Sequence, residues 1–176
     1  MPLHEQELAE VLESECSVEM DKLLSLCRHG IPERLRGEAW KYLLGVMRPE
    51  KSQELSLGKL MEQRYQQLER AGQADSESEL TRRIKGEVRA HRASEPFFRD
   101  ARTHQRLERL LRTYLHRHSS EYIPWMVHLL GPLVQVYRES DTDAYYGTFF
   151  QFRSIYCKVR FFFRVHPHSK CVSFCT

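Results

Sequence analysis

Apolar residues recur along most of the chain at the spacing of one face of an α-helix. This spacing predicts amphipathic helices over residues 3–27, 32–48, 57–68, 80–88, 99–118 and 126–137. The alternation typical of strands is absent before residue 158, and the sequence shows no internal repeat. The predicted fold class is therefore all-α, with an irregular C-terminal tail.

Several residues mark the expected ends of these helices. Pro32 suits the first position of a helix, where the missing N–H costs nothing. Asp75 or Ser76 is expected to cap the helix that follows it. The pair Gly131-Pro132 falls inside the last apolar pattern, so we expect that helix to be kinked there.

Length, charge and cysteine content narrow the class of protein. A chain of 176 residues is the size of one domain. Its net charge of +3 lies within residues 141–176, and the preceding residues are neutral. No segment resembles a membrane span of roughly 18 apolar residues, and the acidic first residues are unlike a signal peptide. Five scattered cysteines favour a reducing compartment. We therefore expect a cytoplasmic protein.

Common catalytic and metal-binding motifs are missing from the sequence. It contains no glycine-rich phosphate loop, no His-Glu-x-x-His and no Gly-x-Ser-x-Gly. The one cluster of metal-ligating residue types is His166, His168, Cys171 and Cys175. A structural zinc site usually pairs two short chelating turns across a longer loop, so an unstructured tail is the preferred interpretation. We predict no metal and no cofactor.

Arginine is concentrated in the middle of the chain. Residues 82–117 hold eleven Lys and Arg but only four acids. The candidate anion-binding residues are Arg89, Arg92, Arg99, Arg102, Arg106 and Arg109. A cationic helix face can bind nucleic-acid phosphates or anionic lipid. Few aromatic residues interleave with these arginines, as base stacking would require. We expect no nucleic-acid partner and favour a solvated face, paired in part with acidic segments.

A first motif occupies residues 30–45, GIPERLRGEAWKYLLG. It contains Gly-Ile-Pro, then Arg-x-x-x-Trp formed by Arg36 and Trp40, then Leu-Leu-Gly. This run closely resembles the opening of TBC domains, the Rab GTPase-activating modules. Trp40 would be a core residue in any helical bundle, and we expect Arg36 to organise the fold rather than to touch a substrate.

A second segment is similar to the TBC motif Ile-x-x-Asp-x-x-Arg-Thr followed by Pro-Phe-Phe. Ile84 takes the first position, Glu87 stands where the family has Asp, and residues 96–98 supply Pro-Phe-Phe in register. Glu87 keeps a carboxylate at its position. The position of the motif arginine is occupied by Ala90.

A third segment is similar to Gly-Tyr-x-Gln-Gly-Met followed by Leu-Leu-Ala-Pro-Leu. Tyr122 and Met126 match this motif, but Pro124 occupies the position of its glutamine. Residues 143–146, Asp-Ala-Tyr-Tyr, resemble the acidic-Ala-Phe-Trp start of a later helix. Three motifs in the same order imply an all-α fold, the N-terminal portion of a TBC domain, and a Rab-family GTPase as partner.

The resemblance also implies how catalysis is affected. In the family, the second-motif Arg stabilises charge on the transferred phosphoryl group and the third-motif Gln orients the attacking water. Ala90 and Pro124 can do neither. An arginine finger is worth about 10³–10⁵ in rate, or roughly 4–7 kcal/mol. Arg89 and Arg92 lie nearby, but a shift of one helical residue turns a side chain by about 100°, so we do not expect Arg89 to substitute.

These observations predict a division of the chain and a ranked set of functions. We expect an N-terminal helix over residues 1–27, a partial Rab-GAP TBC domain over residues 28–157 and a divergent tail over residues 158–176. Phe161-Phe162-Phe163 in the tail would form an exposed apolar patch. The implied function is activation of a Rab GTPase in membrane traffic, with weak or no catalysis. The alternatives are a non-catalytic Rab-binding scaffold, with peripheral membrane association through its partner, and a binder of anionic surfaces.

Overall fold

The computed structural model describes residues 3–72, 78–119 and 121–152, and within these ranges the fold is all-α as predicted. The only β feature in these residues is an isolated bridge between Ser17 and Glu50. The helices are α1 (Leu3–Leu12), α2 (Met20–Cys27), α3 (Glu33–Leu43), α4 (Glu54–Gly72), α5 (Glu79–Ala90), α6 (Pro96–Arg99), α7 (Ala101–His118) and α8 (Trp125–Val136), with a 3₁₀ helix η1 (Lys51–Gln53) before α4. Residues 141–152 are also helical.

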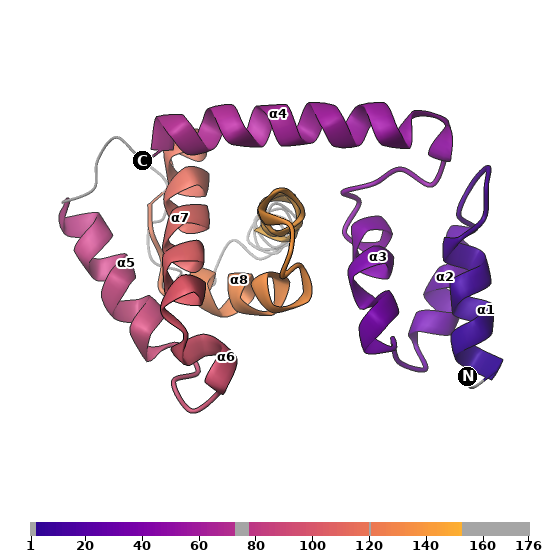
Figure 1. Ribbon diagram of the computed structural model, residues 1–176, viewed down its shortest axis with the longest axis horizontal. Helices are drawn as coiled ribbons and strands as arrows, with labels where there is room; N and C mark the ends of the chain where they lie inside the picture. Colours follow the sequence, from indigo (N-terminus) through magenta and orange to yellow (C-terminus); the bar gives the residue numbers. More distant parts are fainter. Residues whose placement is uncertain (1–2, 73–77, 120, 153–176) are drawn as a thin grey trace, which may run out of the picture.

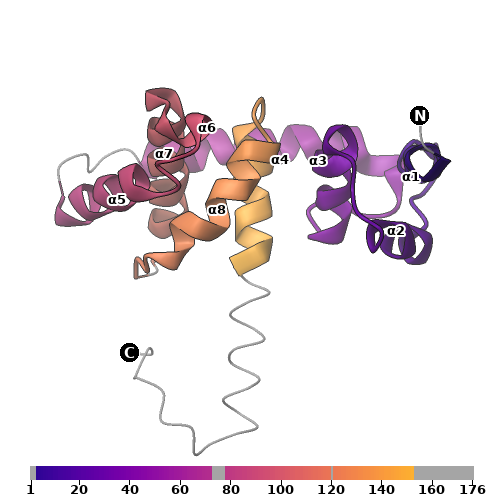
Figure 2. The same ribbon diagram turned by 90° about the horizontal axis from the view of Figure 1, so that it is seen from below.

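Helix α4 connects two groups of helices. It runs along one edge of the molecule, with α1 to α3 near its N-terminal end and α5 to α7 near its C-terminal end (Figure 1). Its 19 residues correspond to about 28 Å of helix. After a quarter turn, α8 and the helix of residues 141–152 lie between the two groups (Figure 2). After forming the two outer groups of helices, the chain therefore returns to the centre of the molecule with α8 and residues 141–152.

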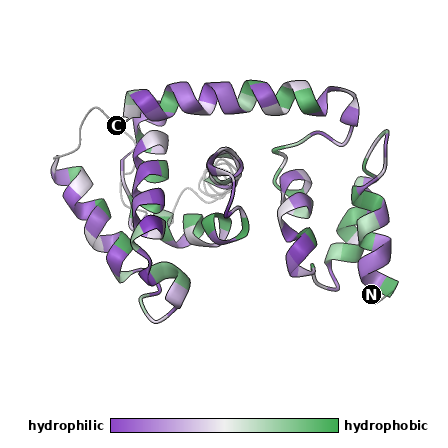
Figure 3. Cartoon of the chain, viewed as in Figure 1, coloured by the Kyte–Doolittle hydropathy of each residue, from purple (hydrophilic) through white to green (hydrophobic). Residues whose placement is uncertain are grey.

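Each group of helices has its own hydrophobic core. The smaller core is formed by α1 to α3 and includes the buried side chains of Leu8, Leu12 and Leu23. The larger core is formed by α4 to α8 with residues 141–152, and Phe98 and Phe152 are its largest fully buried side chains. Helix α8 is apolar over most of its surface, whereas α4, α5 and α7 alternate hydrophobic with hydrophilic residues (Figure 3). This difference fits the central position of α8.

The single helix predicted over residues 3–27 is wrong, because α1 and α2 are separate helices. Residues 13–19 leave the helical path and pair with the segment before η1. The Val18 amide donates to the Pro49 carbonyl at 2.9 Å, and the Val18 side chain is 2% exposed. Contacts between residues 13–19 and the segment before η1 therefore interrupt the helix. The apolar spacing within residues 3–27 does not show these contacts, because their partners lie outside that range.

The start of α5 also differs from its prediction. Ser78 is the N-cap, and its hydroxyl oxygen accepts a hydrogen bond from the Thr81 amide at 3.2 Å. The cap predicted at Asp75 or Ser76 is therefore wrong, and both residues lie outside the described ranges. Such a cap stabilises a helix by satisfying one of its free N–H groups.

The helix predicted over residues 99–118 begins two residues later than expected. Asp100 is the N-cap of α7, and its carboxylate accepts from the Thr103 amide at 3.0 Å. Arg99 therefore belongs to the short helix α6, which has Pro96 in its first turn. Helix α8 continues through Pro132 to Val136. Arg99 and the arginines of α7 thus lie on two helices instead of one.

No described helix is long and apolar enough to cross a membrane. The candidate ligands His166, His168, Cys171 and Cys175 and the Phe161–Phe163 run lie outside the described residues.

Candidate functional site

The two positions predicted from the motif resemblance to correspond to catalytic side chains, Ala90 and Pro124, lie at the end of α5 and just before α8. Ala90 is the last residue of α5 and is exposed, whereas Ile84 and Val88 on the same helix are buried in the core. Pro124 precedes the first residue of α8 and has helical backbone angles, φ −53° and ψ −33°. The core-facing stripe of α5 thus leaves Ala90 on the solvent side of the helix.

Contacts between side chains hold these two segments together. The Arg83 guanidinium carbon lies 5.4 Å from the centroid of the Tyr122 ring. Tyr122 is 3% exposed, and burial together with the nearby Glu87 carboxylate raises its pKa to about 12. Met126, one turn further on, is fully buried in the larger core. Tyr122 therefore contacts α5 through Arg83.

A pair of histidines connects the residue after α5 with α8 itself. The Nδ1 atoms of His91, which follows α5, and His128, in α8, are 3.2 Å apart. The His91 ring also meets the Phe98 ring edge to face, with centroids 4.9 Å apart. A Cβ added to Gly131 would lie 2.4 Å from His91 Nε2. The absence of a side chain at Gly131 therefore lets the His91 ring lie directly on the backbone of α8.

Burial keeps His91 neutral. The residue is 3% exposed, and burial, His128 and Arg92, in that order, lower its pKa to about 4. Its Nε2 atom is buried and has no hydrogen-bond partner among the described residues. Sequence pattern does not reveal this pair, because the two histidines are 37 residues apart and neither lies in a metal-ligand pattern.

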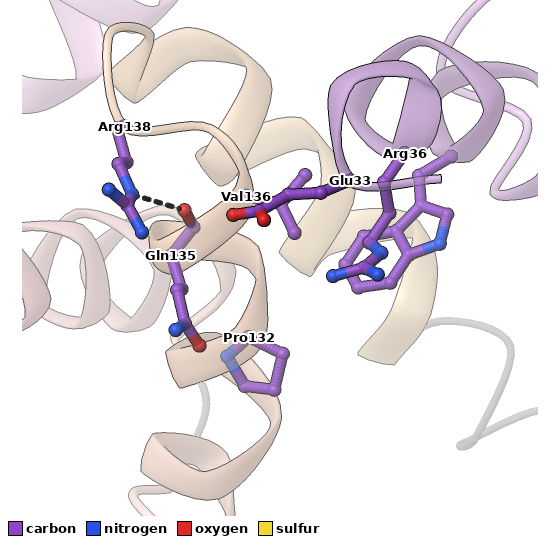
Figure 4. Close-up of a pocket in the computed structure, with 7 residues that line it drawn as sticks. Glu33, Arg36, Pro132, Gln135, Val136 and Arg138 are labelled. Carbon is purple, nitrogen blue, oxygen red and sulfur yellow. Dashed lines mark hydrogen bonds between the residues drawn. The ribbon is translucent and has the colours of Figure 1, made fainter. Parts of the chain in front are cut away.

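The first-motif residues lie at a different place, between α3 and the C-terminal half of α8. A pocket of about 410 Å³ separates Glu33 and Arg36 on α3 from Pro132, Gln135, Val136 and Arg138 (Figure 4). Trp40 also lines it and packs against the larger core. The Arg36 guanidinium donates to the Ile31 carbonyl at 3.3 Å, in the loop before its own helix. This bond ties Arg36 to the loop before α3, and its role in organising the fold stays a prediction.

Two of the candidate anion-binding arginines are used inside the protein. Arg106 and Arg109 of α7 both form ion pairs with Asp141, and Arg109 also pairs with Glu69 of α4, with its Nε 2.8 Å from Oε1. Arg106 and Asp141 are mostly buried, with side chains 14% and 24% exposed. A continuous cationic stripe through Arg106 and Arg109 is therefore wrong, because intramolecular carboxylates neutralise both.

The other four candidates are spread over different segments. Arg89 in α5, Arg99 in α6 and Arg102 in α7 are exposed. Arg92 has a left-handed backbone, φ 45°, and its guanidinium lies 3.3 Å from the Glu95 carboxylate and 5.6 Å from the Phe98 ring centroid. Arg92 is therefore held against its own loop although it is exposed, so four of the six arginines are exposed.

No group of three or more His, Cys, Asp or Glu side chains in the described residues could hold a metal ion.

Comparisons with known proteins agree on one family and one fold. The family model RabGAP-TBC, the Rab-GTPase-TBC domain, matches residues 33–170. Among solved structures the chain is similar to the crystal structure of the Ypt/Rab-GAP domain of Gyp1p, with a TM-score of 0.76 and 16% sequence identity. The similarity covers 89% of this chain and 57% of that one, so the chain spans little more than half the length of that structure. No curated protein sequence matches the chain.

Proposed function

The chain belongs to the Rab-GTPase-TBC domain family, and from this membership we propose that it binds a Rab-family GTPase but lacks the side chains needed for efficient catalysis. The proposed contact surface consists of the end of α5 and the segment before α8. We further propose that the protein acts in the cytoplasm, in membrane traffic, and that it reaches membranes through its GTPase partner.

One observation carries the proposal. Ala90 and Pro124 occupy the two finger positions of a framework whose supporting side chains are present. Ile84 and Met126 are fully buried, and Tyr122 is 3% exposed. These buried side chains support the proposal that the segments keep their family-like packing, while a methyl group and a pyrrolidine ring stand at the proposed finger positions.

The expected loss of rate follows from the chemistry of phosphoryl transfer. Charge develops on the phosphoryl oxygens in the transition state, and an arginine supplied by an activating protein contributes about 10³–10⁵ in rate. Among the neighbours of Ala90, Arg92 is paired with Glu95. Arg89 is exposed, one helical residue away from Ala90 and so turned by about 100°. Neither supports finger catalysis.

Binding and hydrolysis measured side by side test the proposal. A panel of GTP-loaded Rab proteins is titrated with the chain, and single-turnover GTP hydrolysis is followed in the same solutions. The expected result is saturable binding to at least one Rab with an acceleration well below 10³-fold. Acceleration above about 10³-fold would overturn the catalytic part, and absence of binding across the panel would overturn the partner.

A non-catalytic scaffold role is the second candidate, favoured by the same two residues. An activator must bind GTP-loaded Rab more tightly than GDP-loaded Rab. A scaffold has no such requirement, so this role predicts a weaker dependence of Rab affinity on the bound nucleotide. Binding to GDP-loaded and GTP-loaded Rab with similar affinity would select the scaffold. Binding of anionic surfaces through the arginine-rich helix is disfavoured, because Asp141 pairs with Arg106 and Arg109.

A further inference from the structure

A second hollow lies between α4, the C-terminal end of α7 and the helix of residues 141–152. Its volume is about 590 Å³, and none of its lining residues belongs to α5 or α8, which carry the proposed GTPase surface. Its main residues are Arg64, Leu68, Arg117, Tyr145, Tyr146 and Phe149, and we call it the aromatic–basic groove.

The aromatic side chains of the groove are held in place by other rings. Phe149 stacks on His118 with the centroids 5.1 Å apart and the planes at 23°. Tyr145 lies 5.3 Å from the centroid of Tyr146 and 5.3 Å from that of Tyr65 in the core. An incoming apolar group would therefore meet rings whose side-chain entropy is already reduced, which favours binding.

The charge of the groove is all of one sign. Arg64 and Arg117 line it and are exposed, and neither forms an ion pair within the described part of the chain. No Asp or Glu of the described residues lines it. Arg109, on the same helix as Arg117, is by contrast neutralised by Glu69 and Asp141. The two free guanidinium groups thus give the groove a positive potential next to an apolar surface.

We propose that the aromatic–basic groove binds an acidic segment of a partner polypeptide, with an aromatic or leucine side chain between carboxylates. Arg64 and Arg117 come from different helices, which suits carboxylates spaced along a peptide. Arg117 lies in the last turn of α7, where the helix dipole opposes any anion, so the two guanidinium groups and the apolar rings must together supply the affinity.

The chain's own C-terminal residues have the wrong charge to be the occupant. Residues 158–176 contain Lys158, Arg160, Arg164 and Lys170 and no acid. Like charges facing Arg64 and Arg117 would repel. Residues 158–176 are therefore unsuited to the groove, and the proposal commits to a segment of a partner polypeptide that binds apart from the proposed GTPase contact.

Peptide selection on the full chain tests this proposal. A displayed library of random peptides is enriched on the wild type, and the affinity of a selected peptide is then measured. The test variant is Arg64→Glu with Arg117→Glu. The matched control is Arg99→Glu with Arg102→Glu, which changes the same number of exposed arginines outside the groove.

We expect enriched peptides to be acidic and to contain an aromatic residue or leucine. Their affinity should fall about tenfold or more in the groove variant and change little in the control. Thermal unfolding of each variant checks the fold, and Arg64→Gln with Arg117→Gln replaces the groove variant if it is unstable. The proposal is overturned by absence of enrichment, by basic peptides, or by equal loss in both variants. It is also overturned if phosphatidylserine vesicles, and no peptide, bind in a groove-dependent way.

Discussion

Arg106 and Asp141 form an ion pair that caps the C-terminal end of α8. The same guanidinium group donates to the carbonyl oxygens of Val134, at 3.3 Å, and Tyr137. The last carbonyl groups of a helix have no partners within the helix, so a cation placed there satisfies them and interacts favourably with the helix dipole. Asp141 in turn holds Arg106 in position, and thereby connects α7, α8 and the start of the helix of residues 141–152.

Asp141→Asn tests the strength of this connection. It leaves two partly buried guanidinium groups, those of Arg106 and Arg109, without the carboxylate that they share. We expect the free energy of unfolding to fall by about 2 kcal/mol, measured by urea denaturation. Glu79→Gln, which breaks the exposed pair with Arg82, serves as the control and should cost less than about 0.5 kcal/mol. Equal losses of unfolding free energy in the two variants would contradict the stabilising role given to Asp141.

Gly131→Ala tests the packing of His91 on α8. An alanine normally stabilises a helix interior by about 1 kcal/mol relative to glycine. At this position its Cβ would lie 2.4 Å from His91 Nε2, so we expect destabilisation by roughly 1–3 kcal/mol instead. Gly86→Ala in α5, with no atom within 4 Å of the added Cβ, is the matched control and should stabilise. A stabilising Gly131→Ala would show that the ring can move away at little cost.

The lowered pKa of His91 predicts a loss of stability in acid. The folded-state pKa is about 4 against an ordinary value of 6.5, so between these values the unfolded chain binds a proton that the folded chain does not. Stability therefore falls as the pH decreases from 6.5 towards 4, and this histidine contributes no pH dependence above that window. At pH 5 the loss should be about 2 kcal/mol relative to pH 7.

Comparison with His91→Gln isolates this contribution from that of the carboxylates. The variant should lose about 2 kcal/mol less than the wild type between pH 7 and pH 5, in urea denaturation at each pH. His116→Gln, at an exposed position of α7, should follow the wild type. Parallel pH profiles for the wild type and His91→Gln would contradict the prediction.

Local sequence pattern predicted the helices well and the contacts between them poorly. The stripe that includes Leu107, Leu110 and Leu111 is buried on α7 as its spacing indicated. The arginines of α7 were predicted to pair in part with acidic segments, but the pattern did not identify Asp141, more than 30 residues away, as the partner of Arg106 and Arg109. The break after α1 has the same cause, since Lys51 donates to the Leu12 carbonyl across 39 residues. Periodicity reports which face of a helix is buried, but not which distant charge meets it.

The candidate site was proposed from the motifs, whose residues have a fixed spacing along the chain. Fixed spacing brought Ala90 and Pro124 to attention, because their neighbours Ile84, Tyr122 and Met126 match the family pattern. The histidine pair that connects the residue after α5 with α8 was missed, since His91 and His128 contact each other only in the folded chain. The groove that includes Arg64 and Tyr146 was missed as well, because three separate helices form it.

Restoring the finger side chains is the most direct test of the catalytic proposal. Ala90 is exposed at the end of α5, where an arginine also interacts favourably with the helix dipole. Pro124 has helical backbone angles that a glutamine adopts without strain. The double variant Ala90→Arg with Pro124→Gln should therefore fold as the wild type does. If the chain binds a Rab in the family's manner, single-turnover GTP hydrolysis should accelerate by about 10³-fold or more over the wild type.

Each substitution alone defines the controls for this experiment. Ala90→Arg should recover most of the gain, because the arginine stabilises transition-state charge, and Ala90→Lys should recover much less, since an ammonium group lacks the planar fork of donors. Arg89→Ala in the wild type should leave the residual rate unchanged if Arg89 does not act as a finger. A double variant that binds Rab without any acceleration would show that the segments before α8 and at the end of α5 do not face the nucleotide, and the non-catalytic scaffold would then be the better description.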